Sequence, residues 1–117
     1  MEDKPIEEKL LSREEYIQKV LWAYRQTPGT MGTVRAPDRL LAAQLQERGV
    51  PLKAVENALI LATARRMIRA AGAPPLATIR SLAYFTPVIE EVLSLPVSPG
   101  YFEHLRKRIE RFTATGR

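Results

Sequence analysis

The chain has 117 residues, of which 45% are hydrophobic, and it has no cysteine. This length and composition are typical of one globular domain, which buries roughly two-thirds of its unfolded surface in a single modest core. The lack of cysteine excludes disulfides, thiolate zinc sites and thiol nucleophiles, and the small core weighs against an enzyme with a deep catalytic pocket.

Charge is distributed unevenly along the chain. Residues 1–15 carry a net charge of −3 and the remaining residues carry +8, within a total of +5. A basic body favours a polyanionic partner, because Lys and Arg that neutralise phosphates release condensed counterions. The acidic start is unlike a signal peptide, and no run of about 18 apolar residues predicts a membrane helix. We therefore expect a cytoplasmic protein that does not bind membranes.

The first predicted helix follows an acidic start. Residues 1–11 lack a periodic apolar face, so we expect a flexible leader before a single helical domain at 12–117. Ser12 and Glu15 have the spacing of a capping box, which predicts a helix over about 13–25. The apolar stripe of this helix has helical spacing and consists of Ile17, Val20, Leu21 and Tyr24.

Two further helices are separated from the first by a loop. The segment 26–35 is rich in turn residues and is predicted to be the longest internal loop. A second helix over 37–48 begins with a proline and ends before Gly49. The third helix starts after Val50-Pro51 and is predicted to continue to near Gly72.

The fourth predicted helix contains a proline. After the Pro-Pro pair at 74–75, helical apolar spacing resumes at Ile79 and runs through Pro87 to Leu93. An internal proline removes one hydrogen bond and clashes with the preceding turn. This helix is therefore either kinked at Pro87 or restarts there with Thr86 as its N-cap.

A last helix completes the predicted fold. It begins at Ser98-Pro99, and its apolar stripe consists of Phe102, Leu105, Ile109 and Phe112. No segment alternates in the manner of a strand, and no repeat is visible. The sequence thus predicts an all-α protein, a compact bundle of about five helices.

Residues 41–60 have the spacing of a helix-turn-helix. Gly49 suits the tight turn, Val50 follows it, and Val55 lies inside the second helix. Leu45, however, stands where the first helix usually has alanine. The exposed start of the second helix offers only Lys53, Glu56 and Asn57. Recognition helices usually present more donors to base edges, so an ordinary helical hairpin is favoured, and DNA contacts by Lys53 and Asn57 are the alternative.

Basic residues gather on two of the predicted helices. The third helix and the segment after it carry Arg65, Arg66, Arg69 and Arg80. The last helix carries Arg106, Lys107, Arg108 and Arg111. Cations near the end of the third helix also complement its dipole, which is a sufficient structural reason for them. If the two helices pack side by side, both groups form one phosphate-binding surface.

The predicted loop contains a G-x-x-G pattern, from Gly29 to Gly32, followed by Arg35. Such a loop clamps nucleic-acid backbone in KH domains, but those domains also need a three-stranded sheet, which this sequence does not predict. No Gly-Lys-Ser/Thr follows, as a P-loop requires. A mobile connector is the better interpretation.

Catalytic and metal-binding patterns are weak. His104, the only histidine, stands beside Glu103 on the basic last helix and is best interpreted as a surface residue. Glu90 and Glu91 are adjacent, so on a helix they point about 100° apart, unlike metal ligands at i and i+4. We predict no enzyme activity, no metal and no cofactor.

The aromatic side chains allow an alternative function. Four of them, Trp22, Tyr24, Tyr84 and Phe85, stand on the first and fourth predicted helices. Such rings can stack on bases, but more often they fill a core or anchor a partner. The alternative hypothesis is an interaction module whose apolar groove between these helices receives a partner helix or a second copy of the chain.

Residues 49–93 resemble two groups of helical proteins. From Gly-Val-Pro-Leu-Lys-Ala-Val-Glu-Asn-Ala-Leu to Ser-Leu-Ala-Tyr-Phe-Thr-Pro-Val-Ile-Glu-Glu-Val-Leu, they resemble short uncharacterised helical proteins carried with bacterial mobile elements. They are also similar to the helical DnaD-like domain of replication-initiation proteins, which pairs a Gly-started helix with a shorter helix bearing an aromatic pair. The resemblance covers about 45 of 117 residues and implies a role in DNA transactions without assigning site residues.

The leading hypothesis combines the charge with this resemblance. We expect a non-enzymatic helical accessory protein that binds DNA, or a DNA-bound protein complex, through basic helix surfaces. Phosphate contacts would dominate, so affinity would fall steeply with salt and depend little on sequence.

Overall fold

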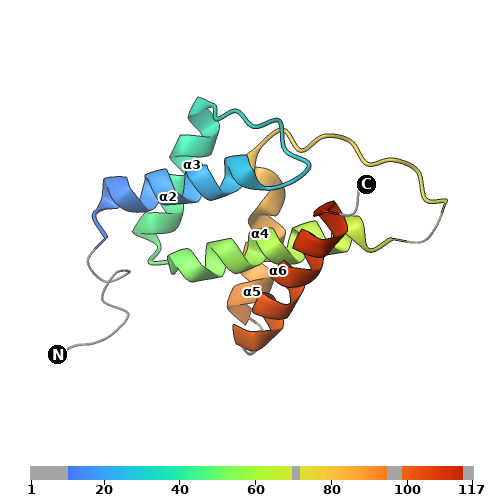
Figure 1. Ribbon diagram of the computed structural model, residues 1–117. Helices are drawn as coiled ribbons and strands as arrows, with labels where there is room; N and C mark the ends of the chain where they lie inside the picture. Colours follow the sequence, from blue (N-terminus) through green and yellow to red (C-terminus); the bar gives the residue numbers. More distant parts are fainter. Residues whose placement is uncertain (1–10, 70–71, 95–98, 115–117) are drawn as a thin grey trace.

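The computed structural model describes residues 11–69, 72–94 and 99–114. Within these ranges it is all helical and contains no strand, which confirms the predicted fold class (Figure 1). The elements are α2 (Arg13–Gln26), α3 (Ala36–Glu47), α4 (Leu52–Met67), the 3-10 helix η1 (Leu82–Phe85), α5 (Thr86–Ser94) and α6 (Pro99–Ala114).

Helix α4 is the centre of the bundle. Helices α2, α5 and α6 and η1 all pack against it, whereas α3 packs on α2 and η1 (Figure 1). The main core cluster joins α2, α3, α4, η1 and α5, and it includes Val20, Leu45, Val55, Leu82 and Ile89. A second cluster between α4 and α6 consists of Leu61, Ala64, Phe102 and Leu105. Among the helices described, none is long and apolar enough to cross a membrane.

The start of α2 is the predicted capping box. The Ser12 hydroxyl accepts a hydrogen bond from the Glu15 backbone N–H at 3.0 Å, and the Glu15 carboxylate accepts one from the Ser12 N–H at 2.9 Å. Two backbone donors that a helix start leaves unpaired are thus satisfied. Leu11, the last residue of the predicted leader, packs against the core. The rest of the leader lies outside the described residues.

The turn between α3 and α4 has the predicted glycine. Gly49 adopts φ +77°, a conformation that a side chain disfavours, and Val50 donates its N–H to the Leu45 carbonyl at 3.1 Å. The Tyr16 hydroxyl donates to the Val50 carbonyl at 2.7 Å, which fastens the turn to α2.

Asp38 ties the start of α3 to η1. The residue is 2% exposed. One carboxylate oxygen accepts from the Arg35 N–H and the other from the Leu82 N–H, both at 2.9 Å. This carboxylate therefore holds two segments that are 44 residues apart in sequence.

The predicted third helix is too long. Helix α4 ends at Met67, because Ile68 leaves the helical region with φ −94° and ψ +82°. Gly72 lies in a turn, and residues 73–78, which include the Pro-Pro pair, have no regular secondary structure.

The predicted fourth helix is wrong at its start. Ile79 is buried but extended, and it forms an isolated parallel bridge with Thr30. The predicted restart is found one residue earlier: α5 begins at Thr86, directly after η1, and Thr86 has helical dihedral angles rather than those of an N-cap. Pro87 is the second residue of α5, where a missing N–H breaks no helical bond.

The last helix begins at Pro99, as predicted. Phe102 and Leu105 are buried, and Ile109 is half-buried. Ser98, its proposed cap, and the side chain of Phe112 lie outside the described part of the chain.

Candidate nucleic-acid interface

Two loops lie side by side at one end of the bundle (Figure 1). The loop between α2 and α3 meets the segment between α4 and η1 at Ile79, whose N–H donates to the Gly29 carbonyl at 2.7 Å. The Ile79 carbonyl accepts from the Met31 N–H at 3.1 Å. The loop predicted as a mobile connector is therefore bonded to a second segment.

Three arginines are bonded to the segment 74–80 through its carbonyl groups. Arg69 donates to the Pro74 carbonyl at 2.7 Å, Arg66 to the Ala77 carbonyl at 2.9 Å, and Arg35 to the Arg80 carbonyl at 3.2 Å. The acceptors are three residues apart, so contacts recur at most about every 10 Å along an extended chain. With the exposed Arg80, they form what we call the arginine strip: Arg35, Arg66, Arg69 and Arg80.

Arg66 is the most constrained member of the strip. It donates to the Tyr84 hydroxyl at 3.2 Å and lies 5.7 Å from the centre of the Tyr84 ring. A Cβ atom at Gly29 would lie 3.3 Å from two of its guanidinium nitrogens. Gly29 also adopts φ +93°, so both the backbone and the arginine favour glycine at this position.

The arginine strip keeps its positive charge. A carbonyl accepts a hydrogen bond without neutralising the guanidinium, and among the described residues none of the four arginines has a carboxylate within ion-pair distance. Residues 57–89 contain four arginines and no acid. Asp38, the only acid between Glu15 and Glu47, is buried and bonded to backbone N–H groups.

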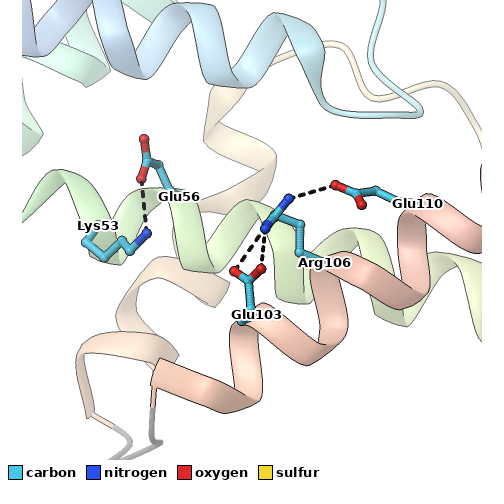
Figure 2. Close-up of polar contacts among 5 residues, drawn as sticks. All are labelled: Lys53, Glu56, Glu103, Arg106 and Glu110. Carbon is cyan, nitrogen blue, oxygen red and sulfur yellow. Dashed lines mark hydrogen bonds and ion pairs between the residues drawn. The ribbon is translucent and has the colours of Figure 1, made fainter.

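Other predicted phosphate contacts are bonded to carboxylates. Arg65 donates to Glu91 on α5 at 2.8 Å, and this bond raises the pKa of Arg65 and lowers the pKa of Glu91. Arg106 lies between Glu103 and Glu110 on α6 (Figure 2), and bonding to Glu103 raises the pKa of Arg106. These guanidinium charges are therefore compensated within the protein.

The basic residues of the two predicted clusters do not all lie on one surface. Helices α4 and α6 do pack together, but Arg65 and Arg66 are adjacent and point about 100° apart. Arg65 faces α5, and Arg66 faces the loops. The remaining cations of α6 are exposed on that helix: Lys107, Arg108 and Arg111. Arg108 borders a small hollow beside the last turn of α4.

The helix-turn-helix contacts lie in a different setting. Lys53 and Asn57 line a groove of about 660 Å³ between α2, α4 and α6. Asn57 is half-buried there, and Lys53 lies 4.0 Å from Glu56 (Figure 2). Because α3 packs on α2 and η1 and acids border this face of α4, the geometry favours the ordinary hairpin.

The predicted aromatic partner site is divided between core and surface. Tyr24 and Phe85 are fully buried and meet edge to face, with ring centroids 6.2 Å apart. Trp22 is 62% exposed and Tyr84 is 46% exposed. Trp22 lines the groove between α2, α4 and α6, whereas Tyr84 contacts Arg66. These four rings therefore do not line one groove between the first and fourth predicted helices.

Arg35 was absent from the basic site predicted by the sequence. The signal that identifies it is the scarcity of acid on either side. Between Glu15 and Glu47 the chain has Asp38 alone, at a helix-capping position, and three arginines besides one lysine. Basic residues in a long segment with so few acids have few local ion-pair partners. They are therefore better candidates for binding an external anion than arginines that stand near a glutamate in the sequence.

Comparison with family models, with curated proteins and with solved structures finds no match for this chain.

Proposed function

We propose that this protein is a non-enzymatic accessory protein that binds DNA through the arginine strip. The observation that supports this function is the set of four arginines along one segment, of which three are bonded to carbonyl groups and, among the described residues, none to a carboxylate. Even with the buried Asp38 counted, the strip has an excess of positive charge.

The carbonyl bonds prepare the strip for phosphate. Arg35 and Arg69 each use one guanidinium nitrogen for the carbonyl bond, and a guanidinium has five N–H donors in a planar fork. The bond restricts the side chain before the ligand arrives, which reduces the entropy lost on binding. Arginines on backbone phosphates position DNA without reading its sequence, so binding is expected at many sequences.

The first test is fluorescence anisotropy of a labelled DNA duplex across a series of salt concentrations. Three to four phosphate contacts predict a slope of about −3 in the logarithm of the binding constant against that of salt, with dissociation constants on the order of 10⁻⁴ to 10⁻⁶ M. A protein that fails to bind at low ionic strength would refute the proposal.

A single variant tests whether the strip is the site. Arg80→Gln removes an exposed charge whose side chain makes no described contact, so the fold is expected to be unaffected. It should reduce the salt slope by about 0.9, the contribution of one phosphate. Arg13→Gln is the matched control, because Arg13 is also exposed but pairs with Glu47 at 3.6 Å. Equal losses in both variants would mean that net charge, rather than the strip, drives binding.

A further inference from the structure

The groove between α2, α4 and α6 has the composition of an interface. Its apolar wall residues come from all three helices: Ala23, Leu59, Ile60, Phe102 and Ile109. Polar residues border it, including the two ion-pair groups in Figure 2. An apolar centre within a polar rim is the usual organisation of a protein interface.

Trp22 stands at this groove and is 62% exposed. It is the only tryptophan of the chain. Tryptophan is among the residues most enriched at the energetic centres of interfaces, where a partner covers its large apolar surface. Its position beside an apolar groove, rather than in the core, indicates a surface that is completed by another molecule.

The charge of the rim indicates the partner's chemistry. Glu103, Arg106 and Glu110 together carry one net negative charge, and the Lys53–Glu56 pair carries none. Of the charged residues that line the groove, three are acids and two are bases, in a protein whose net charge is +5. Complementary potentials favour a partner with Lys or Arg beside its apolar side chains.

The walls of the groove indicate the partner's conformation. They are α-helices, whose backbone groups are bonded within each helix, so the walls have no strand edge to pair with an extended peptide. A helical partner satisfies its own backbone groups. The lining runs from Lys53 to Thr63 on α4 and from Phe102 to Glu110 on α6, or about 15 Å and 12 Å of helix. We propose that the groove binds two to three turns of a basic amphipathic α-helix of a partner protein.

Synthetic peptides and the fluorescence of Trp22 test this inference. The first peptide is a 14-residue helix with leucine on one face and lysine beside it. One control has the same composition in shuffled order, and the other has glutamate in place of lysine. We expect the leucine-lysine helix to shift Trp22 emission to shorter wavelength and to saturate, and both controls to bind at least roughly tenfold more weakly, about 1.4 kcal/mol. Equal affinity of either control would overturn the proposal.

Matched variants locate the binding site. Ile60→Gln changes a half-buried groove residue, and Leu40→Gln changes a residue of α3 that is 61% exposed and lies outside the groove. The first should weaken peptide binding at least roughly tenfold and the second less than about twofold. If Ile60→Gln fails to fold, Trp22→Ala with a labelled peptide replaces it, since Trp22 is not part of the core.

Two further results would overturn the proposal. Peptide binding that is unchanged in the groove variant would place the site elsewhere. Self-association of the wild-type chain in sedimentation experiments, abolished by the groove variant, would show that a second copy occupies the groove.

Discussion

Arginine has two different roles in this molecule. Arg48, Arg65 and Arg106 are bonded to the carboxylates of Glu90, Glu91 and Glu103. The arginines of the strip are bonded to carbonyl groups or, in the case of Arg80, make no described side-chain contact. Of these two kinds, only the second has a charge that no described carboxylate compensates, which is why we propose it as the phosphate site. The net charge of a chain therefore does not locate an anion site until each cation is assigned a partner.

We expect the largest effect on stability from a substitution of Asp38, the buried residue that supports the strip. Asp38→Ala leaves the N–H groups of Arg35 and Leu82 without an acceptor. Unpaired buried donors cost about 1–3 kcal/mol each, so we expect a loss of about 3 kcal/mol in the free energy of unfolding, measured by urea titration. Asp38→Asn keeps one carbonyl oxygen and should lose less. A change below about 0.5 kcal/mol in the alanine variant would contradict this role.

A smaller effect is expected at Gly29, beside Arg66. Gly29→Ala combines a positive φ with close approach to the guanidinium, and we expect about 2 kcal/mol of destabilisation. Gly32→Ala is the matched control, because Gly32 has φ +80° but nothing within 4 Å of the added Cβ. The difference between the two free energies of unfolding measures the contact with Arg66. No difference would mean that Arg66 moves aside without loss.

These supports show where sequence reasoning succeeds and where it fails. The capping box at Ser12 and the turn at Gly49 were predicted correctly, because each depends on local chemistry. The prediction of a helix from Ile79 onward was wrong, because the spacing of Ile79 to Leu82 and Phe85 suits a helix. Its actual partner, Thr30, is remote in sequence.

The strip and the groove could be predicted only in part. Arg66, Arg69 and Arg80 of the strip belong to the basic set predicted from the sequence, which also includes Arg65 and Arg106. Glu91, the partner of Arg65, is 26 residues away in sequence and is recognisable only in the folded structure. Glu103 and Glu110 stand three and four residues from Arg106, so helical spacing could have identified them. The groove depends on how α2 and α6 are placed on α4, which local patterns do not specify.

Tyr24 allows a test of the core beneath the strip. Its hydroxyl is buried, and the described residues provide no hydrogen-bond partner for it. Burial raises its pKa, with a further contribution from Asp38. Tyr24→Phe removes an unsatisfied polar atom, so we expect thermal unfolding to show unchanged stability or a gain of up to about 1 kcal/mol. A loss of more than about 1 kcal/mol would mean that the hydroxyl has a partner.

The carboxylate-bonded arginines predict the smallest effect, a dependence of stability on pH. Bonding to Arg48 and Arg65 lowers the pKa of Glu90 and Glu91 from the ordinary value of 4.5. The stabilisation is present above that value and is lost as pH falls through the lowered folded-state pKa. Both pairs are exposed, so the effect is small. Urea titrations from about pH 5 to about pH 3 should show a flatter decline in the variant Glu90→Gln, Glu91→Gln. An unchanged pH profile would contradict the assignment.

The most direct test of the account compares two triple variants of equal charge. The first variant removes three charges from the strip and combines Arg35→Gln, Arg69→Gln and Arg80→Gln. The second removes three charges from the carboxylate-bonded arginines and combines Arg48→Gln, Arg65→Gln and Arg106→Gln. Duplex affinity is measured by anisotropy across salt, with circular dichroism to confirm the fold. We predict that the strip variant loses most of its salt slope, roughly 2.7, while the other variant binds within about twofold of the wild type, less than 0.5 kcal/mol. Equal losses in the two variants would contradict the account.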